Sequence, residues 1–338
     1  MSGERSTLVG TPVVVAPGKV FLVGEYSVLE GGAAVLAAVD RLAVAQFVPG
    51  MDAASRVVAE AVNRATAEIG EAASALPAGS ALVNTDDFRH DDQKIGLGSS
   101  ASTAVASVGA VFESAGIAVA SNRDQIFATA YAAHRAAQDG AGSGADVAVA
   151  TYGGLLKVQK KVGAGLPVVE PLTVPAGLQL VVFWTGQAVS TMNMIDAMTK
   201  FARKESAAYR QLIGSLQEIA DRFVDEIRAG NATAAVAAAG RYGRRLAVLG
   251  SAASVPIFTD AFNRASDLAK ELGGIAKPSG AGGGDIGIAM FATPEAARLF
   301  ARALPKPLVA IDLDLDPFGV RRRLPGENLP ERVGLFHA

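Results

Sequence analysis

The sequence contains no cysteine, which excludes disulfide bonds, thiolate metal sites and cysteine nucleophiles. A chain of this kind is expected in a reducing cytoplasm. Aromatic residues make up only 6% of the chain and alanine is abundant, so we expect helices that pack closely through small side chains. No apolar run reaches the roughly 18 residues that a membrane span needs. Residues 1–10 show no basic segment followed by an apolar one, so we expect neither a signal peptide nor a membrane partner.

An excess of charge of one sign is also lacking. The formal net charge is −2, which argues against an attraction of the whole chain to nucleic acid. The three histidines, His90, His134 and His337, show no metal-ligand spacing and are expected to be surface or helix residues. A small molecule is therefore the expected partner, and the sequence leaves open whether the chain is a monomer or a homodimer.

The chain is long and apolar enough for two domains, with 338 residues of which 50% are hydrophobic. Residues 162–177 are rich in proline and glycine and poor in charge, and we expect the domain boundary there, giving domains 1–175 and 176–338. The first half begins with strands and the second is rich in helices, so we predict an α+β fold. We expect strands within 13–48, 178–184, 286–291 and 307–316, and helices over 52–74, 101–119, 122–138, 193–229, 232–249, 256–272 and 293–304.

Glycine is concentrated in three short segments that carry the functional signal. In the first, APGKVFLVGEY (16–26), Lys19 follows a Pro-Gly turn and leads into a strand. It is either an ordinary surface lysine or a cation placed for chemistry.

The second segment, GLGSSAS (96–102), stands at the predicted start of a helix. The first backbone N–H groups of a helix lack partners within the helix, and they attract anions such as phosphate. Glycines let a phosphate approach the backbone closely, and serine hydroxyls add donors or a magnesium ligand. The alternative interpretation is a plain serine cap of the helix.

The third segment, KPSGAGGGDIGIAMF (277–291), has a run of glycines directly before a strand, which a helix cap does not explain. Four of them, Gly280, Gly282, Gly283 and Gly284, cost backbone entropy on folding, so a ligand or another backbone is expected against this loop. The sequence has no Walker loop. The segment 96–101 fits a relaxed dinucleotide fingerprint, but the residues before it do not form a buried strand, which argues against that interpretation.

These three segments, in this order, resemble the superfamily of galactokinase, homoserine kinase, mevalonate kinase and phosphomevalonate kinase (GHMP kinases). SGADVAVATYGG (143–154), WTGQAVST (184–191) and PSGAGGGD (278–285) resemble the phosphomevalonate kinase branch in particular. The resemblance implies an N-terminal half like ribosomal protein S5 domain 2 and a ferredoxin-like C-terminal half, with ATP and substrate between them. It also implies phosphoryl transfer from ATP to 5-phosphomevalonate, giving 5-diphosphomevalonate and ADP.

The resemblance also implies roles for individual residues. Lys19 would neutralise charge on the transferring phosphoryl group, and Ser100 would be a Mg²⁺ ligand. The nucleotide phosphates would lie on Gly96, Gly98, Ser99, Ser100 and Ala101. The acceptor would contact Lys19, Glu25, Tyr26, Ser143, Asp146, Ser190, Thr191, Ser279, Gly280, Gly282 and Gly283.

Two of these roles stay open. Asp146 matches an acidic position that acts as a base in relatives that phosphorylate an alcohol. A phosphate monoester has its second pKa at about 6 and is already mostly anionic at pH 7, so Asp146 is expected to orient Lys19 or the metal instead. Ser190 and Thr191 either bind the substrate phosphate or cap the helix that follows.

Three other functions compete with this interpretation. A mevalonate kinase would have the same fold and would use Asp146 as a true base. A diphosphomevalonate decarboxylase would also use ATP. A ligand sensor would keep the fold and lack catalysis, although the joint presence of Lys19, Ser100 and Asp146 favours an enzyme.

Overall fold

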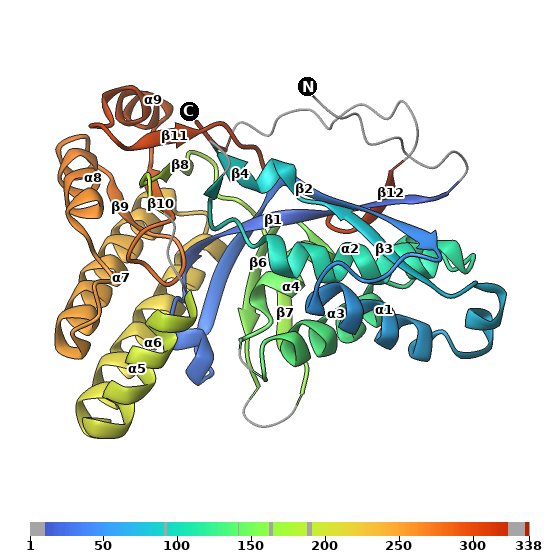
Figure 1. The fold of residues 1–338 in the computed structure, drawn as a ribbon. Coiled ribbons are helices and arrows are strands. Elements are labelled where there is room, and N and C mark those ends of the chain that lie inside the picture. Colours follow the sequence, from blue (N-terminus) through green and yellow to red (C-terminus); the bar gives the residue numbers. More distant parts are fainter. Residues whose placement is uncertain are drawn as a thin grey trace.

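The computed structural model has two main antiparallel sheets, a two-stranded one and nine α-helices in its described part, and it confirms the α+β prediction (Figure 1). None of the described helices is long and apolar enough to cross a membrane. The structure describes residues 11–90, 93–140, 142–161, 165–187, 191–323 and 335–337, and of residues 191–193 the backbone only.

The larger sheet is built on two long strands, β1 (Val13–Val23) and β2 (Ala33–Pro49), which pair antiparallel. Their runs of alanine and β-branched residues are almost wholly buried, as expected for strands covered on both faces. The strand order is β12-β1-β2-β6-β7, and β3 also pairs with β2. The remaining strands are β3 (Gly79–Asn84), β6 (Leu155–Gln159), β7 (Val168–Leu172) and β12 (Arg321–Arg323), and a separate hairpin is formed by β4 (Arg89–His90) and β5 (Gln93–Lys94).

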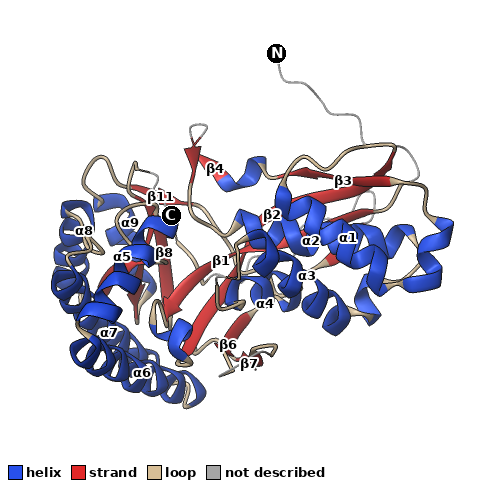
Figure 2. Cartoon of the chain, turned by 60° about the horizontal axis from the view of Figure 1, so that its bottom comes forward, coloured by secondary structure: helices blue, strands red, loops and turns tan. Residues whose placement is uncertain are grey.

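Four helices from the first half of the chain lie on the larger sheet (Figure 2). Helices α2 and α4 contact β1 and β2, and α1 and α3 pack on α2. Helix α2 is buried on nearly all sides between Ala101 and Phe112, which fits its place between the sheet and the outer helices. The bounds are α1 (Arg56–Glu68), α2 (Ser99–Ser114), α3 (Arg123–Ala137) and α4 (Ala145–Tyr152).

The smaller sheet has the order β11-β8-β10-β9, and its two faces pack against different helices. Phe183 packs with Phe262 and Phe300 from α8 and α9, whereas its neighbours Val182 and Trp184 belong to the main core. Thr293 caps α9 by accepting a hydrogen bond from the Ala296 N–H. The elements are β8 (Gln179–Trp184), β9 (Ile275–Pro278), β10 (Ile286–Phe291), β11 (Val309–Ile311), α5 (Thr191–Lys204), α6 (Ser206–Arg228), α7 (Ala232–Ala253), α8 (Asp260–Glu271) and α9 (Pro294–Ala303).

Several elements differ from the sequence prediction. The stretch 162–177 contains strand β7, which pairs with β6 at the edge of the larger sheet. The strand expected over 307–316 covers only Val309–Ile311, because the chain then leaves the sheet and the Asp314 N–H donates to the Asp40 side chain. The helical stretch 193–229 is two helices that part at Glu205. No observation tests the domain boundary near residue 175, and it stays a prediction.

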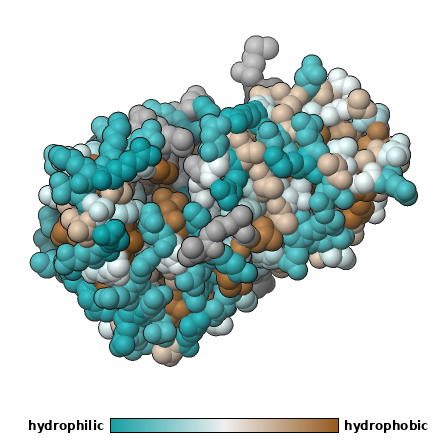
Figure 3. Space-filling view, turned by 90° about the horizontal axis from the view of Figure 1, so that it is seen from below, coloured by the Kyte–Doolittle hydropathy of each residue, from teal (hydrophilic) through white to brown (hydrophobic). Residues whose placement is uncertain are grey.

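The two sheets come together where β1 ends. Seen from below, the surface is mostly hydrophilic, and hydrophobic residues reach it in small patches beside a hollow between the two parts of the molecule (Figure 3). The start of α2, the start of α4, the turn after β1 and the loop between β9 and β10 all border one cavity.

Candidate active site

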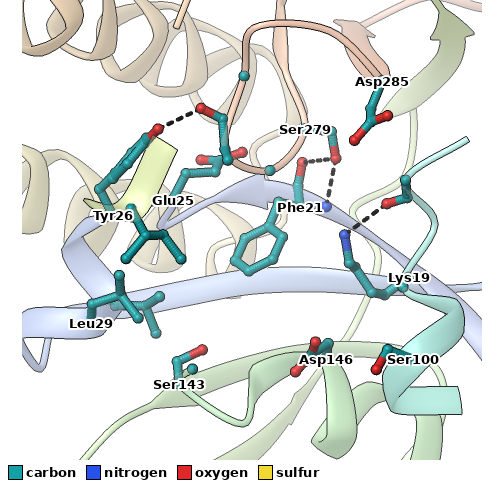
Figure 4. A pocket seen from close by; sticks show the side chains of 18 of the residues that line it. Lys19, Phe21, Glu25, Tyr26, Leu29, Ser100, Ser143, Asp146, Ser279 and Asp285 are labelled. Carbon is teal, nitrogen blue, oxygen red and sulfur yellow. Dashed lines mark hydrogen bonds between the residues drawn. The ribbon is translucent and has the colours of Figure 1, made fainter. Parts of the chain in front are cut away.

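A cavity of about 500 Å³ brings the three glycine-rich segments together (Figure 4). Its walls come from β1 and the turn after it, from the N-termini of α2 and α4, and from the loop between β9 and β10. The predicted site residues that line it are Lys19, Glu25, Tyr26, Gly96, Gly98, Ser99, Ser100, Ser143, Asp146, Ser279, Gly280 and Gly282.

The other four predicted residues are not among the described residues that line the cavity. Ala101 is buried inside α2 and does not line the cavity. Gly283 does not line the cavity, and its N–H donates to the Ile257 carbonyl at 3.0 Å. Ser190 lies outside the described residues. Thr191 is the first residue of α5, and its side chain is likewise not described.

Helix α2 presents an open N-terminus to the cavity. Its N-cap is Gly98 in the left-handed conformation, at φ 86°, and this residue has no side chain that could accept from the first turn. The serine-cap interpretation is therefore wrong, and Ser99 and Ser100 lie in the first turn with the unpaired N–H groups. Such a terminus binds anions through its backbone.

Lys19 lies in β1 directly beside this terminus, and it is 9% exposed, so it is not a surface lysine. Its Nζ donates to the Gly96 carbonyl at 3.1 Å. A Cβ on Gly98 would lie 3.0 Å from the Lys19 Cγ, so glycine leaves room for the lysine stem. Burial lowers the pKa of Lys19, and the charges of Asp146 and Asp285 oppose that shift.

Two carboxylates face the lysine from opposite sides of the cavity. Asp146 lies in the first turn of α4 and accepts a hydrogen bond from the Val147 N–H at 3.0 Å. Asp285 ends the glycine loop, and a Cβ on Gly96 would lie 2.8 Å from its Cβ. Figure 4 shows Asp146 beside Ser100 below the lysine and Asp285 above it.

The loop between β9 and β10 is fastened to β1 by hydrogen bonds. The Ser279 hydroxyl accepts from the Phe21 N–H at 2.8 Å and donates to the Phe21 carbonyl. The Tyr26 hydroxyl donates to the Ala281 carbonyl at 2.5 Å. Burial, and to a lesser degree the nearby Glu25 charge, raises the pKa of Tyr26, so it stays a neutral donor. Ser279 and Tyr26 therefore hold the loop as well as line the cavity.

Glu25 forms a buried ion pair with Lys277 on β9. Lys277 is fully buried, and its Nζ also donates to the Pro278 carbonyl at 2.9 Å. The second carboxylate oxygen of Glu25 has no hydrogen-bond partner among the described residues. The Tyr242 hydroxyl of α7 donates to the Glu25 carbonyl at 2.7 Å. One end of the glycine loop is thus held by a charge pair that the sequence analysis did not predict.

Sequence reasoning missed several other residues of the site. Lys94 at the end of β5 and Gln138 after α3 line the cavity, as do Phe21 and Ile195. The position of Lys94 two residues before GLGSS was an available signal. His134 is buried, and its Nε2 lies 3.2 Å from the Ser100 hydroxyl, which no spacing in the sequence shows.

Comparisons with known proteins match both halves of the chain. The family model "GHMP kinases N terminal domain" matches residues 62–154, and "GHMP kinases C terminal" matches residues 223–310. Phosphomevalonate kinase of Streptomyces sp. (strain CL190) is 30% identical over 342 residues, which covers 84% of this chain and 90% of that protein. This chain belongs to the GHMP kinase family.

Other known proteins are similar over less of the chain or at lower identity. Mevalonate kinase of Thermococcus sibiricus is 27% identical over 239 residues, or 63% of this chain and 68% of that protein. The structure of Streptococcus pneumoniae phosphomevalonate kinase in complex with phosphomevalonate and AMPPNP has a TM-score of 0.75 at 18% identity, covering 90% of this chain and 99% of that one. A Lin0012 protein from Listeria innocua has a TM-score of 0.83 at 24% identity, covering 93% and 99%. The two solved structures confirm the GHMP kinase fold.

The donor set of this GHMP kinase fits a magnesium ion that arrives with a nucleotide. The described residues contain no group of three or more His, Cys, Asp or Glu that could hold a metal on their own. The Ser100 hydroxyl and the Asp146 carboxylate face the same cavity. Magnesium in such sites takes one or two protein ligands and completes its shell with phosphate oxygens and water.

Proposed function

We propose that the protein transfers the γ-phosphoryl group of ATP to 5-phosphomevalonate, giving 5-diphosphomevalonate and ADP. The observation that carries this is the meeting of Lys19, the open N-terminus of α2 and the loop between β9 and β10 around one cavity. A cation beside an anion-binding helix end is what phosphoryl transfer needs, because its catalysis is mostly positioning and charge stabilisation. The Streptomyces relative supports the choice of acceptor.

The nucleotide phosphates bind at the start of α2 in this proposal. Gly96 and Gly98 both have positive φ and no side chain, so a phosphate can approach the backbone there. Ser99 and Ser100 add hydroxyls in the first turn of the helix. Ser100 would be a ligand of a magnesium ion that accompanies the nucleotide, and that ion would neutralise charge on the phosphate oxygens.

Lys19 stabilises the negative charge that develops on the transferring phosphoryl group. It is held between the Gly96 carbonyl and the charges of Asp146 and Asp285, so it needs little reorganisation during the reaction. The acceptor phosphate is already mostly anionic at pH 7 because its second pKa is about 6. Asp146 therefore orients Lys19 or the metal, and no base is required.

The acceptor lies on the other side of Lys19, between the turn after β1 and α4. Glu25, Tyr26, Ser143 and the loop from Ser279 border that part of the cavity. Lys94, which the sequence analysis did not select, supplies a second cation at the cavity. Ser190 and Thr191 stay candidates for the substrate phosphate.

The proposal also includes the cellular compartment, the partners and the oligomeric state of the enzyme. The lack of cysteine favours the cytoplasm, and the net charge of −2 gives no reason to expect nucleic acid as a partner. A monomer or a homodimer both fit, and the oligomeric state stays a prediction.

The proposal is tested by ADP release with Mg-ATP and one acceptor at a time: mevalonate, 5-phosphomevalonate or 5-diphosphomevalonate. We expect turnover with 5-phosphomevalonate alone. Turnover with mevalonate would make the enzyme an alcohol kinase with Asp146 as base. Carbon dioxide from the diphosphate would indicate a decarboxylase, and no reaction with any acceptor would favour a sensor.

Two substitutions test the assigned roles. Lys19→Ala is expected to lower kcat by about 10²–10³-fold, as for the loss of one preorganised donor to a transition state. Asp146→Asn is expected to cost less, because the residue acts through Lys19 or the metal. Lys270→Ala, on the exposed face of α8, is the matched control. A loss with Asp146→Asn as complete as that with Lys19→Ala contradicts this order.

A further inference from the structure

A chain of three polar side chains runs from the outer helix α3 to the first turn of α2. The Nε2 atom of His134 lies 3.2 Å from the Ser100 hydroxyl and 3.0 Å from the Gln138 amide nitrogen. His134 is 3% exposed, whereas Ser100 and Gln138 both line the cavity. The histidine thus touches the candidate phosphate and metal site from behind.

The chemistry of the three groups fixes the direction of the hydrogen bonds. The Gln138 amide nitrogen is a donor only, so the His134 Nε2 that it meets is the unprotonated, accepting nitrogen of a neutral ring. The Ser100 hydroxyl meets the same nitrogen, so its proton points to that atom and shares the single lone pair with the Gln138 N–H. His134 and Gln138 are four residues apart, so they lie on the same side of α3 and hold each other in place.

This direction decides what Ser100 can bind. A phosphate oxygen only accepts hydrogen bonds. Because the Ser100 hydroxyl already donates its hydrogen bond to His134, it cannot donate one to phosphate. Its oxygen lone pairs remain for a cation. The hydroxyl of Ser99, in the same turn, makes no hydrogen bond with a described residue and is left to donate to phosphate.

We propose that His134 is a positioning residue that fixes Ser100 as a ligand of the divalent cation that accompanies the nucleotide. The inference rests on the proposed function, because it takes the bound molecule to be a metal–nucleotide complex. In this inference Ser100 binds the cation and Ser99 donates to phosphate. His134, which is remote in sequence, causes this difference.

The test measures nucleotide affinity by calorimetry with ATP alone, once with Mg²⁺ and once with EDTA, in the absence of any acceptor. His134→Leu removes the accepting nitrogen with little change in volume. We expect it to weaken binding of ATP with Mg²⁺ by about 10–100-fold, as typical for loss of a group that orients a metal ligand. Affinity in EDTA should stay as in the unchanged protein.

Further variants separate positioning from packing. His134→Gln offers an amide oxygen to the Ser100 hydroxyl and should restore most of the Mg²⁺-dependent affinity. Ser100→Ala should lose it, and Ser100→Ala with His134→Leu should lose no more than Ser100→Ala alone. Thr129→Val, at another buried polar position of α3, should leave affinity unchanged with and without Mg²⁺.

Other results would overturn the proposal. His134 would only support the fold if His134→Leu lowered the affinity for ATP equally with Mg²⁺ and with EDTA. The same would follow if the double variant lost affinity by the product of the two single losses. If His134→Leu does not fold, Gln138→Leu replaces it, and an unchanged Mg²⁺ dependence there would count against the proposal. Turnover of 5-phosphomevalonate by the unchanged protein is measured in parallel. If the proposed function is wrong, the unchanged protein shows no turnover. If the role of His134 is wrong, the ATP-binding measurements show it.

Discussion

At the scale of residues, the site depends on two buried lysines in different settings. Lys19 faces the cavity and is surrounded by the charges of Asp146, Asp285 and Glu25. Lys277 lies behind the cavity wall and is paired with Glu25 alone among the described carboxylates. Burial lowers the pKa of both, so each relies on its carboxylate partners to stay charged.

The lowered pKa of Lys19 predicts an unusual alkaline limit of activity. A lysine loses its proton as the pH rises through its pKa, so kcat/KM should fall at a lower pH than ordinary lysine titration gives. In Lys19→Arg the side chain stays charged, and the alkaline fall should move to higher pH even if the overall rate is lower. The measurement is kcat/KM against pH for both proteins. If kcat/KM fell at the same alkaline pH in both proteins, a group other than Lys19 would cause the fall.

The Glu25–Lys277 pair predicts a large effect on stability. Lys277→Met leaves a buried carboxylate without its counter-charge, which is expected to cost about 3–5 kcal/mol of unfolding free energy. Glu25→Gln combined with Lys277→Met removes both charges and should recover much of that loss. Urea denaturation followed by circular dichroism measures both values. A double variant no more stable than Lys277→Met would contradict the pairing argument.

At the scale of elements, the site is made by the ends of helices and strands. The starts of α2 and α4 and the end of β1 all meet at the cavity, and glycines allow their backbones to approach one another. Gly98 at the start of α2 is the clearest case, since it needs a positive φ and lies against Lys19.

Gly98→Ala is expected to raise the KM for ATP. The added methyl group costs about 1–2 kcal/mol in the left-handed conformation and also presses on the lysine stem, at 3.0 Å from Cγ. Gly116→Ala is a matched control, because Gly116 also has positive φ, 78°, but a Cβ there meets no atom within 4 Å. Initial rates at varied ATP compare the two. Equal KM values would mean that the loop geometry does not matter for nucleotide binding.

The sequence predicts elements where the signal is local. The strands β8 and β10 and the helix α9 follow from apolar runs and from Thr293 with Pro294. Strand β9 contains a lysine and a proline, and its pairing with β10 depends on a contact across the glycine loop, so it was not predicted. Strand β12, a run of three arginines, joins β1 from the far end of the chain.

The residues of the candidate site, like the elements of the fold, are predictable only where the signal in the sequence is local. The three glycine segments predict most of the residues that line the cavity, because close backbone approach demands glycine wherever it occurs. His134 and Lys277 were missed because their importance comes from partners far away in the sequence, Ser100 and Glu25. Composition and spacing do not reveal contacts of that kind.

At the scale of the whole molecule, the two sheets are tied together at the active site. Ser279 bonds to the backbone of Phe21, Tyr26 bonds to Ala281, and Lys277 pairs with Glu25. The chain also returns to the larger sheet near its end, where Arg321 in β12 pairs with the buried Asp316 at 2.9 Å. Each half of the molecule therefore contributes part of the cavity wall.

The proposed function requires this cavity to add a phosphoryl group to a phosphate. This is followed by ³¹P NMR of a mixture of the protein, Mg-ATP and 5-phosphomevalonate over time. We expect the monoester signal to be replaced by a pair of coupled diphosphate signals as ADP appears, and Lys19→Ala to slow this change strongly. An unchanged monoester signal, or the same rate in Lys19→Ala, would refute the proposed function.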